Sequence, residues 1–236
     1  MISSRESSLR EGGVLAWTVF AALVAMLPAQ TQAGDFAEQQ MLVDKSKLTL
    51  EAFAADPSLK DALRDLSHEA KALFIAPQFM RGAFIFGGAG GSGVLLVRDE
   101  KTGKWGQPVF YNIGSASFGL QIGADVSEIV LVVRTKKGLE EFYTNDFKLG
   151  ANAGMAVGPV GGGASVHGIA ADILSYARKK GVFAGIALEG ATVTVSNDSN
   201  TAYYGKPVRP TDIVVKGDVS NPKSLPLRET AAKLMK

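Results

Sequence analysis

The glycine-rich stretch at residues 88–93 is the first place in this 236-residue sequence where spacing could serve chemistry. It reads GAGGSG, which matches the dinucleotide-binding pattern GxGxxG, and it follows a predicted strand. That motif requires a helix after its last glycine, because the helix N-terminus holds the pyrophosphate. Residues 94–97 (VLLV) are strand-like instead. We therefore interpret the glycines as a flexible loop or bend and predict no nucleotide site.

Residue types that usually catalyse reactions are sparse. His68 and His167 have no ligand cluster around them, and no second histidine follows His68 at the zinc-protease spacing. The chain has no cysteine, which excludes thiol catalysis, thiolate metal sites and disulfides. The carboxylate pairs at 99–100 and 140–141 lie in polar stretches and indicate solvated faces. The sequence therefore predicts no catalytic residue, metal site or cofactor, although carboxylates from distant segments could still form an active site.

Two basic clusters could bind phosphate groups. Each follows an apolar segment and precedes a glycine, and they consist of Arg134, Lys136 and Lys137, and of Arg178, Lys179 and Lys180. Such cations commonly complement the end of a helix. They also suit lipid headgroups, because each cation near an anionic membrane contributes about 1 kcal/mol. The sequence alone leaves both interpretations open.

A hydrophobic segment at residues 74–81 could contact lipid. It carries Phe74, Phe79 and Met80 beside Arg81. Large apolar residues next to arginine suit a membrane interface. Apolar side chains are more often buried, however, so the alternative is core packing where a helix meets a sheet.

The N-terminal residues 1–33 resemble a secretory leader. Arg5 and Arg10 precede an apolar run at 14–27, and Thr31 and Ala33 place small residues at the two cleavage-pocket positions. The run is shorter than the ~20 residues of a membrane-spanning helix. We expect a signal peptide over residues 1–33, with an uncleaved anchor as the alternative.

The chain has the pattern of one globular domain with a sizeable core, since 46% of its 236 residues are hydrophobic. The net charge of +2 is too even to favour nucleic acid as a partner. Apolar periodicity predicts helices at 36–54, 57–73, 166–180 and 227–235, and strands at 83–86, 93–98, 109–111, 128–134, 182–188 and 191–195. Residues 197–200 are predicted to form a turn, with 203–205 closing a hairpin. The predicted fold is α+β: a curved, mainly antiparallel sheet with N-terminal helices and one central packing helix at 166–180.

Five ordered blocks resemble the SYLF family, also called the Ysc84 actin-binding family. They are QIGAD at 121–125, NDFKLG at 145–150, AVGPVG at 156–161, SYARKKGVFAG at 175–185 and LEG at 188–190. The resemblance implies a lipid-binding module, placed here at residues 34–205, with 206–236 as a C-terminal extension. It implies phosphoinositide binding in eukaryotic members, partly through an amphipathic N-terminal helix, and actin binding in the yeast branch. An export leader is typical of a bacterial secreted branch and would separate this chain from actin, which remains a partner by family analogy only.

The expected function is that of a secreted or periplasmic, non-enzymatic protein that associates peripherally with membranes. Its expected ligand is an anionic phospholipid or phosphoinositide headgroup. Arg178, Lys179 and Lys180 are the first candidate contacts, Arg134, Lys136 and Lys137 the second, and Phe74, Phe79 and Met80 the insertion candidates. The alternatives are an envelope scaffold or protein-interaction module and, more weakly, an enzyme acting on lipids.

Overall fold

The computed structural model describes residues 28–83, 86–118, 123–179, 181–184 and 188–236. Its helices are α2 (Pro28–Ala55), α3 (Lys60–Glu69), α4 (Lys136–Glu141), α5 (Asn197–Tyr204) and α6 (Leu225–Leu234), with short helical turns η1 (Pro57–Leu59), η2 (Asp212–Lys216) and η3 (Pro222–Ser224). Most of the predicted leader lies outside the described residues, and its last residues, 28–33, begin α2. Within the described ranges no helix combines the length and apolar character needed to cross a membrane.

Nine strands form one sheet in the described part of the chain. They are β1 (Ala72–Ala83), β2 (Phe86–Val97), β3 (Val109–Phe118), β4 (Gly123–Val133), β5 (Asp146–Lys148), β6 (Met155–Val157), β7 (Ile173–Lys179), β8 (Val182–Ala184) and β9 (Thr192–Val195). Their order is β5-β9-β3-β2-β1-β4-β7-β6, and β8 pairs with β7. All pairings are antiparallel except β6 with β7. The predicted α+β class with a curved, mainly antiparallel sheet is confirmed.

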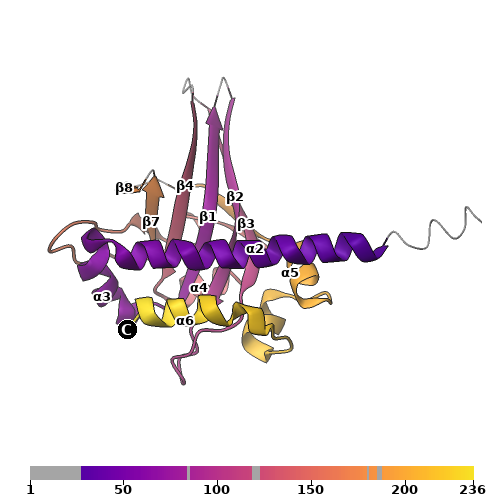
Figure 1. Ribbon diagram of the computed structural model, residues 1–236. Helices are drawn as coiled ribbons and strands as arrows, with labels where there is room; N and C mark the ends of the chain where they lie inside the picture. The colour runs from indigo at the N-terminus through magenta and orange to yellow at the C-terminus, as the bar shows by residue number, and fades with distance from the viewer. Residues whose placement is uncertain (1–27, 84–85, 119–122, 180, 185–187) are drawn as a thin grey trace, which may run out of the picture.

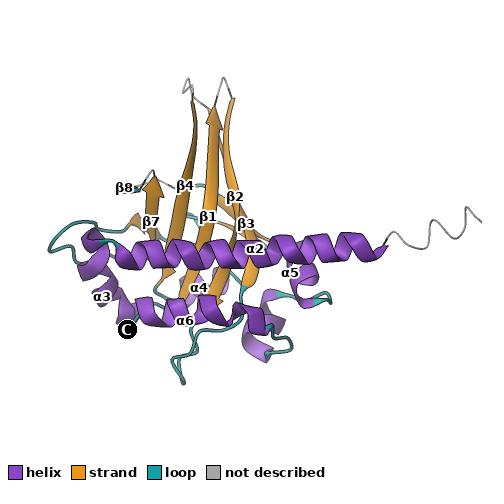
Figure 2. Ribbon diagram, in the orientation of Figure 1, coloured by secondary structure: helices purple, strands orange, loops and turns teal. Residues whose placement is uncertain are grey.

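The two sides of the sheet bury different sets of side chains, as alternation along a strand requires. We call the side covered by α2 the helix face, where Leu73 and Ile75 of β1 pack with Leu50 and Phe53 of α2. The opposite side is the far face, whose core includes Phe74 of β1. Figures 1 and 2 show α2 lying across the strands with α6 beside it. The central packing helix is therefore α2.

The helix predicted at 166–180 is wrong. Residues 173–179 form β7, and 166–172 form a loop that leads into it. The burial pattern explains the error, because five consecutive residues from Ile173 to Ala177 are buried. A strand covered on both faces has a continuous apolar run rather than alternation, and its spacing can match a helix by chance.

The hairpin predicted around residues 197–205 is also wrong, because residues 197–204 form α5. Asn200 is buried, accepts a hydrogen bond from the Phe110 N–H at 3.0 Å and donates one to the Phe110 carbonyl at 3.2 Å. The Asn200 side-chain amide thus makes the two hydrogen bonds with Phe110 of β3 that a neighbouring strand would otherwise make. This tertiary contact is not visible in local sequence.

Strand β1 begins earlier than predicted, since α3 ends at Glu69 and residues 74–81 are part of the sheet. Pro77 lies at an irregularity where the β1–β4 register shifts between Ala76 and Phe79. Such a bulge tolerates proline because a ladder hydrogen bond is already missing there. The glycine motif at 88–93 lies inside β2, so the loop predicted there is wrong.

The ends of β1, β2 and β4 project beyond the helix layer (Figures 1 and 2), and β3 pairs with β2 as far as Phe118. Strand β7 pairs with β4 only from Glu128 onward, and β9 pairs with β3 only as far as Gly114. Beyond these points the described sheet consists of β1 to β4 alone. We call this part, residues 80–83, 86–89, 115–118 and 123–127, the projecting sheet.

Candidate functional site

The first predicted basic cluster lies at the base of the projecting sheet. Arg178 is on the helix face, where its Nε lies 2.5 Å from Glu128 Oε2. Thr49 of α2 donates a hydrogen bond to the same carboxylate at 3.2 Å, so this group also ties α2 to the sheet. Lys179 points to the far face, where its Nζ lies 2.8 Å from Asp125 Oδ2. Lys180 lies outside the described residues.

Met80 is the one predicted insertion residue that is exposed. The Met80 side chain lies on the helix face, next to Val126, its partner in the β1–β4 ladder. Met80 is 61% exposed and Val126 is 52% exposed, although both belong to the sheet. Lys45 of α2 reaches Gln78 of β1 at 3.1 Å, two residues before Met80. The pair of apolar side chains thus begins where the cover of α2 ends.

The prediction that Phe74 and Phe79 insert into a membrane is wrong. Their side chains are 0% and 1% exposed. Both lie in the far-face core, where the Phe74 ring packs 6.3 Å from Tyr111 and 6.0 Å from Phe142. The core-packing alternative therefore holds for the two phenylalanines but not for Met80.

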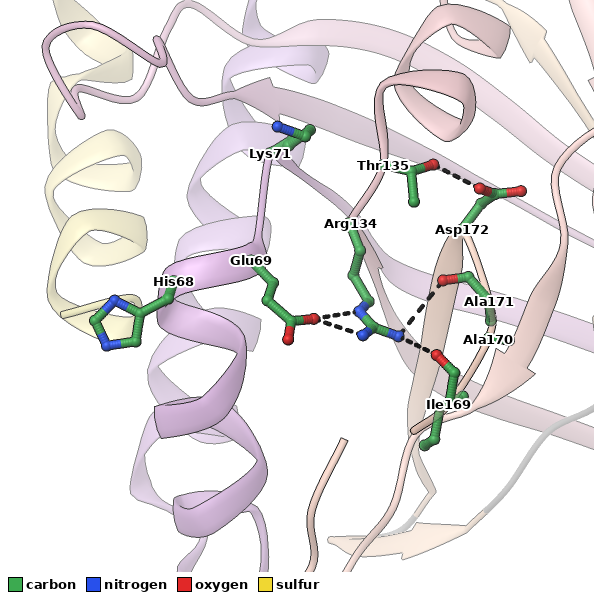
Figure 3. A pocket seen from close by; sticks show the side chains of 9 residues that line it. All are labelled: His68, Glu69, Lys71, Arg134, Thr135, Ile169, Ala170, Ala171 and Asp172. Carbon is green, nitrogen blue, oxygen red and sulfur yellow. Dashed lines mark hydrogen bonds and ion pairs between the residues drawn. The ribbon is translucent and has the colours of Figure 1, made fainter. Parts of the chain in front are cut away.

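The second predicted basic cluster lies at the opposite end of β4, away from Met80. Arg134 is fixed in place, with Nε and Nη2 each 2.6 Å from Glu69 Oε2 and Nη1 donating to the Ile169 carbonyl at 2.8 Å (Figure 3). Its side chain is only 13% exposed, which indicates a structural role. Lys137 Nζ lies 3.6 Å from Asp172, and Lys136 is exposed. The structure thus does not bring the two clusters together.

A cleft surrounds Arg134 at this end of the sheet, which we call the basal cleft. One hollow of about 540 Å³ is lined by His68, Glu69, Lys71, Arg134, Thr135, Ile169, Ala170, Ala171 and Asp172 (Figure 3). An adjoining hollow of about 440 Å³ shares His68, Glu69 and Lys71 with it. The carboxylates of the cleft are largely paired with cations, since Glu69 forms an ion pair with Arg134 and the Glu100 carboxylate lies 2.6 Å from the Lys71 ammonium. The basal cleft is therefore polar and charge-balanced.

A serine, a histidine and an aspartate meet on the surface of α3, a cluster that sequence analysis missed. Ser165 Oγ and Asp65 Oδ2 lie 2.9 Å and 3.1 Å from the same atom, Nδ1 of His167. A nucleophilic triad needs its serine and carboxylate on different ring nitrogens. Although desolvation acts to raise the pKa of Asp65, the Ser165 hydrogen bond and the nearby His167 lower it. The cluster fastens the 158–172 loop to α3 and has no catalytic geometry.

Asp172 organises the wall of the basal cleft and predicts an acid-sensitive contribution to stability. Its carboxylate accepts hydrogen bonds from the Thr135 hydroxyl at 2.6 Å and the Gly154 N–H at 2.9 Å. Desolvation acts to raise the pKa of Asp172, but these bonds and Lys137 lower it below the ordinary 3.8. A lowered folded-state pKa stabilises the fold above the unfolded value, and the effect disappears as pH falls through the folded value.

We therefore expect Asp172→Asn to lower the free energy of unfolding by about 1.5–3 kcal/mol at pH 7, as for hydrogen bonds to a charged group. The difference from the parent should shrink progressively as pH falls below about 4, because the Asp172 carboxylate of the parent then becomes protonated. Urea unfolding at pH 7, 5, 4 and 3 measures it, with exposed Asp218→Asn as the control. A difference that stays constant down to pH 3 would contradict the assignment.

Comparison with known proteins finds one matching family model, described as Ysc84, Las17-binding protein actin regulator, over residues 114–234, just over half of the chain. A bovine protein, SH3 domain-containing YSC84-like protein 1, is 33% identical over 159 residues, 65% of this chain and 46% of its own length. The rat protein of the same name is 34% identical over 148 residues, 61% of this chain and 43% of its own length. LAS seventeen-binding protein 3 of Saccharomyces cerevisiae is 32% identical over 150 residues, 60% of this chain and 32% of its own length. The chain thus spans less than half the length of these relatives.

Proposed function

Because the chain belongs to the Ysc84 (SYLF) family, we propose that it is a non-enzymatic binding protein whose ligand is the anionic surface of a phospholipid membrane. The predicted leader supports export, so the protein acts outside the cytoplasm as a peripheral membrane protein. Phosphate-bearing headgroups are its ligands, and the family resemblance supports phosphoinositides among them.

One observation carries the proposal: exposed apolar side chains and cations occur together at one end of the sheet. Met80 and Val126 are neighbours in the β1–β4 ladder, and Arg178 lies opposite Glu128, two residues along β4. Arg81 follows Met80 directly, and Lys179 follows Arg178. Apolar side chains flanked by cations suit a lipid–water interface, because the side chains enter the acyl boundary while the cations remain among the headgroups.

The ion pairs at this site limit its strength. Arg178 and Lys179 already contact Glu128 and Asp125, so each carboxylate offsets part of the attraction to an anionic surface. Lys179 is nonetheless 40% exposed on its side chain, which leaves the ammonium within reach of headgroups. We expect binding that is moderate and sensitive to salt, since exposed charges are screened within about 10 Å at 0.1 M ionic strength.

A protein partner is the second candidate function, and the names of the relatives favour it. One relative is named for binding LAS seventeen, and others for their SH3 domains. Actin regulation is part of the description of the matching family model. A partner protein for this chain would therefore be expected to bind in the absence of lipid.

Co-sedimentation of the purified protein with vesicles tests the proposed function. Vesicles of phosphatidylcholine alone are compared with vesicles that also contain phosphatidylserine or phosphatidylinositol 4-phosphate, in 50 to 500 mM salt. Binding to the anionic vesicles that weakens with salt is expected. Absence of binding to any of them would overturn the proposal and leave the protein-partner function as the leading one.

Substitutions at the two partners of the Lys179–Asp125 ion pair should change vesicle binding in opposite directions. Lys179→Gln should weaken binding to anionic vesicles, and Asp125→Asn should strengthen it, because the first removes a positive charge and the second a negative charge. Each change is expected to be up to about fivefold, corresponding to about 1 kcal/mol per charge. Asp218→Asn, exposed and in the segment between α5 and α6, is the matched control. Equal binding by all four proteins would remove this ion pair from the site.

A further inference from the structure

We infer that the projecting sheet is itself the element that enters the membrane, to a shallow depth, with α2 lying along the membrane surface. The inference rests on the proposed function and specifies it, because it assigns insertion to strand ends rather than to a helix. The partner is an anionic lipid bilayer.

The shape of the molecule supports this orientation. The ends of β1, β2 and β4 extend past α2 on its upper side in Figures 1 and 2, where β3 pairs with β2 as far as Phe118, and no other described element reaches as far. Below this level the helix face is covered by α2, where Lys45 contacts Gln78 and Thr49 contacts Glu128. Above it, Met80 and Val126 are exposed on the same face. A flat surface approaching from the projecting end therefore meets the two apolar side chains before it meets α2.

The charges around these strands match an anionic surface. Arg178 lies on the helix face beside α2 and Lys179 on the far face, so both sides of the sheet carry a cation near its base. Lys45 adds a third cation from α2, hydrogen-bonded to the neutral Gln78. Arg178 and Lys45 contact residues that precede the Met80–Val126 pair on the side of α2, and the Lys179 ammonium reaches Asp125, the neighbour of Val126. All three cations therefore lie near the level of Met80, where headgroups would be if Met80 reached the acyl boundary.

Strand geometry limits the depth. From Met80 to the last described residue of β1, Ala83, the strand advances three residues, or about 10 Å at ~3.3 Å per residue. Interfacial elements enter to about 5–10 Å, whereas a spanning strand needs about 9–11 residues. The described part of β1 beyond Met80 thus has the length of an interfacial element and is much shorter than a spanning strand.

Backbone hydrogen bonding imposes the same limit. Strands β1 and β2 have partners on both sides, so their N–H and C=O groups are satisfied within the sheet. Among the described residues, the outer edges of β3 beyond Gly114 and of β4 before Glu128 have no partner strand. Unpaired backbone groups are costly in hydrocarbon but can bond water and headgroups at the interface. The sheet can therefore enter the interface but not cross it.

The absence of cysteine from the sequence allows each position to be probed with a single label. Met80→Cys and Val126→Cys, each carrying a polarity-sensitive fluorophore, are bound to phosphatidylcholine–phosphatidylserine vesicles. Val215→Cys is the matched control, because Val215 is a 67% exposed apolar residue in η2. We expect emission at 80 and 126 to shift to shorter wavelength and to be quenched by lipids brominated near the headgroup. The label at 215 should show neither effect.

The outcomes separate the inference from the proposed function. Vesicle binding with water-like emission at both 80 and 126 would overturn the inference and leave membrane binding standing. Failure of the unlabelled parent to bind vesicles would overturn the proposed function itself. A shift that occurs without vesicles and grows with protein concentration would show that a second copy covers this face, which also overturns the inference. Thermal unfolding of each labelled protein, matched to that of the parent, verifies that the label leaves the fold intact.

Discussion

Replacing Phe74 with alanine is expected to lower the free energy of unfolding by about 3–5 kcal/mol, the range for removing a phenyl group from a packed core. The ring is completely buried at the centre of the far-face core. It contacts Tyr111 edge-on at 6.3 Å and Phe142 at 6.0 Å, and such ring pairs add to the energy of burial. The surrounding strands are hydrogen-bonded on both sides, so the cavity cannot readily collapse. Urea unfolding followed by circular dichroism measures the change.

Met80→Ala is the matched control, because Met80 lies in the same strand and is 61% exposed. Its effect on unfolding should be within about 0.5 kcal/mol, as for most surface substitutions. The effects on vesicle binding should be reversed. Met80→Ala should bind vesicles less well than the parent, whereas Phe74→Ala molecules that are folded should bind as the parent does. If Phe74→Ala retained full stability and lost vesicle binding, the burial of this ring in the core would be contradicted.

A single extra residue explains why the sequence did not distinguish Phe74 and Phe79 from Met80. In a regular strand, residues five apart lie on opposite faces and residues six apart on the same face. The β1–β4 register advances three residues from Ala76 to Phe79 but only two from Ile129 to Ser127. This bulge places Phe79 on the same face as Phe74 and turns Met80 to the helix face. A one-residue shift reverses the face of every later side chain, and no sequence pattern located this one.

Local sequence patterns predicted an element correctly where the element is buried on one side only or contains a distinctly apolar run. The strand expected at 128–134 is the core of β4, and the helix expected at 36–54 lies within α2. The same patterns gave the wrong secondary structure where tertiary contacts determine it, as in β7 and around Asn200. The ion pairs of the candidate site were also out of reach, because Arg178 and Glu128 are 50 residues apart and meet only through the β4–β7 register. The basic clusters are visible in the sequence, but their carboxylate partners are not, because Glu128, Asp125 and Glu69 each lie at least 50 residues from the cation they pair with.

Gly93→Ala is expected to destabilise the protein by about 3 kcal/mol, at the upper end of the range for overpacking a core. A Cβ at Gly93 would lie 2.5 Å from the Ile75 carbonyl oxygen and 2.6 Å from a carbon of the Phe74 ring. Both neighbours are fixed, one by its strand and the other by the far-face core, so the backbone would have to shift. Chemical unfolding gives the magnitude. Gly82→Ala in β1 is the control, because a Cβ there meets nothing within 4 Å, and it should be neutral or slightly stabilising.

The two large effects should not add, which tests the packing more sharply than either alone. With Phe74 replaced by alanine, the ring that obstructs the new methyl group is gone, and that methyl group occupies part of the cavity. The double variant should therefore be more stable than the sum of the single losses predicts, by at least about 0.5 kcal/mol, as for residues in direct contact. The Ile75 carbonyl still obstructs the methyl group, so the gain remains partial. Strict additivity would show that the cost of Gly93→Ala comes from the backbone contact alone and that the ring moves aside without cost.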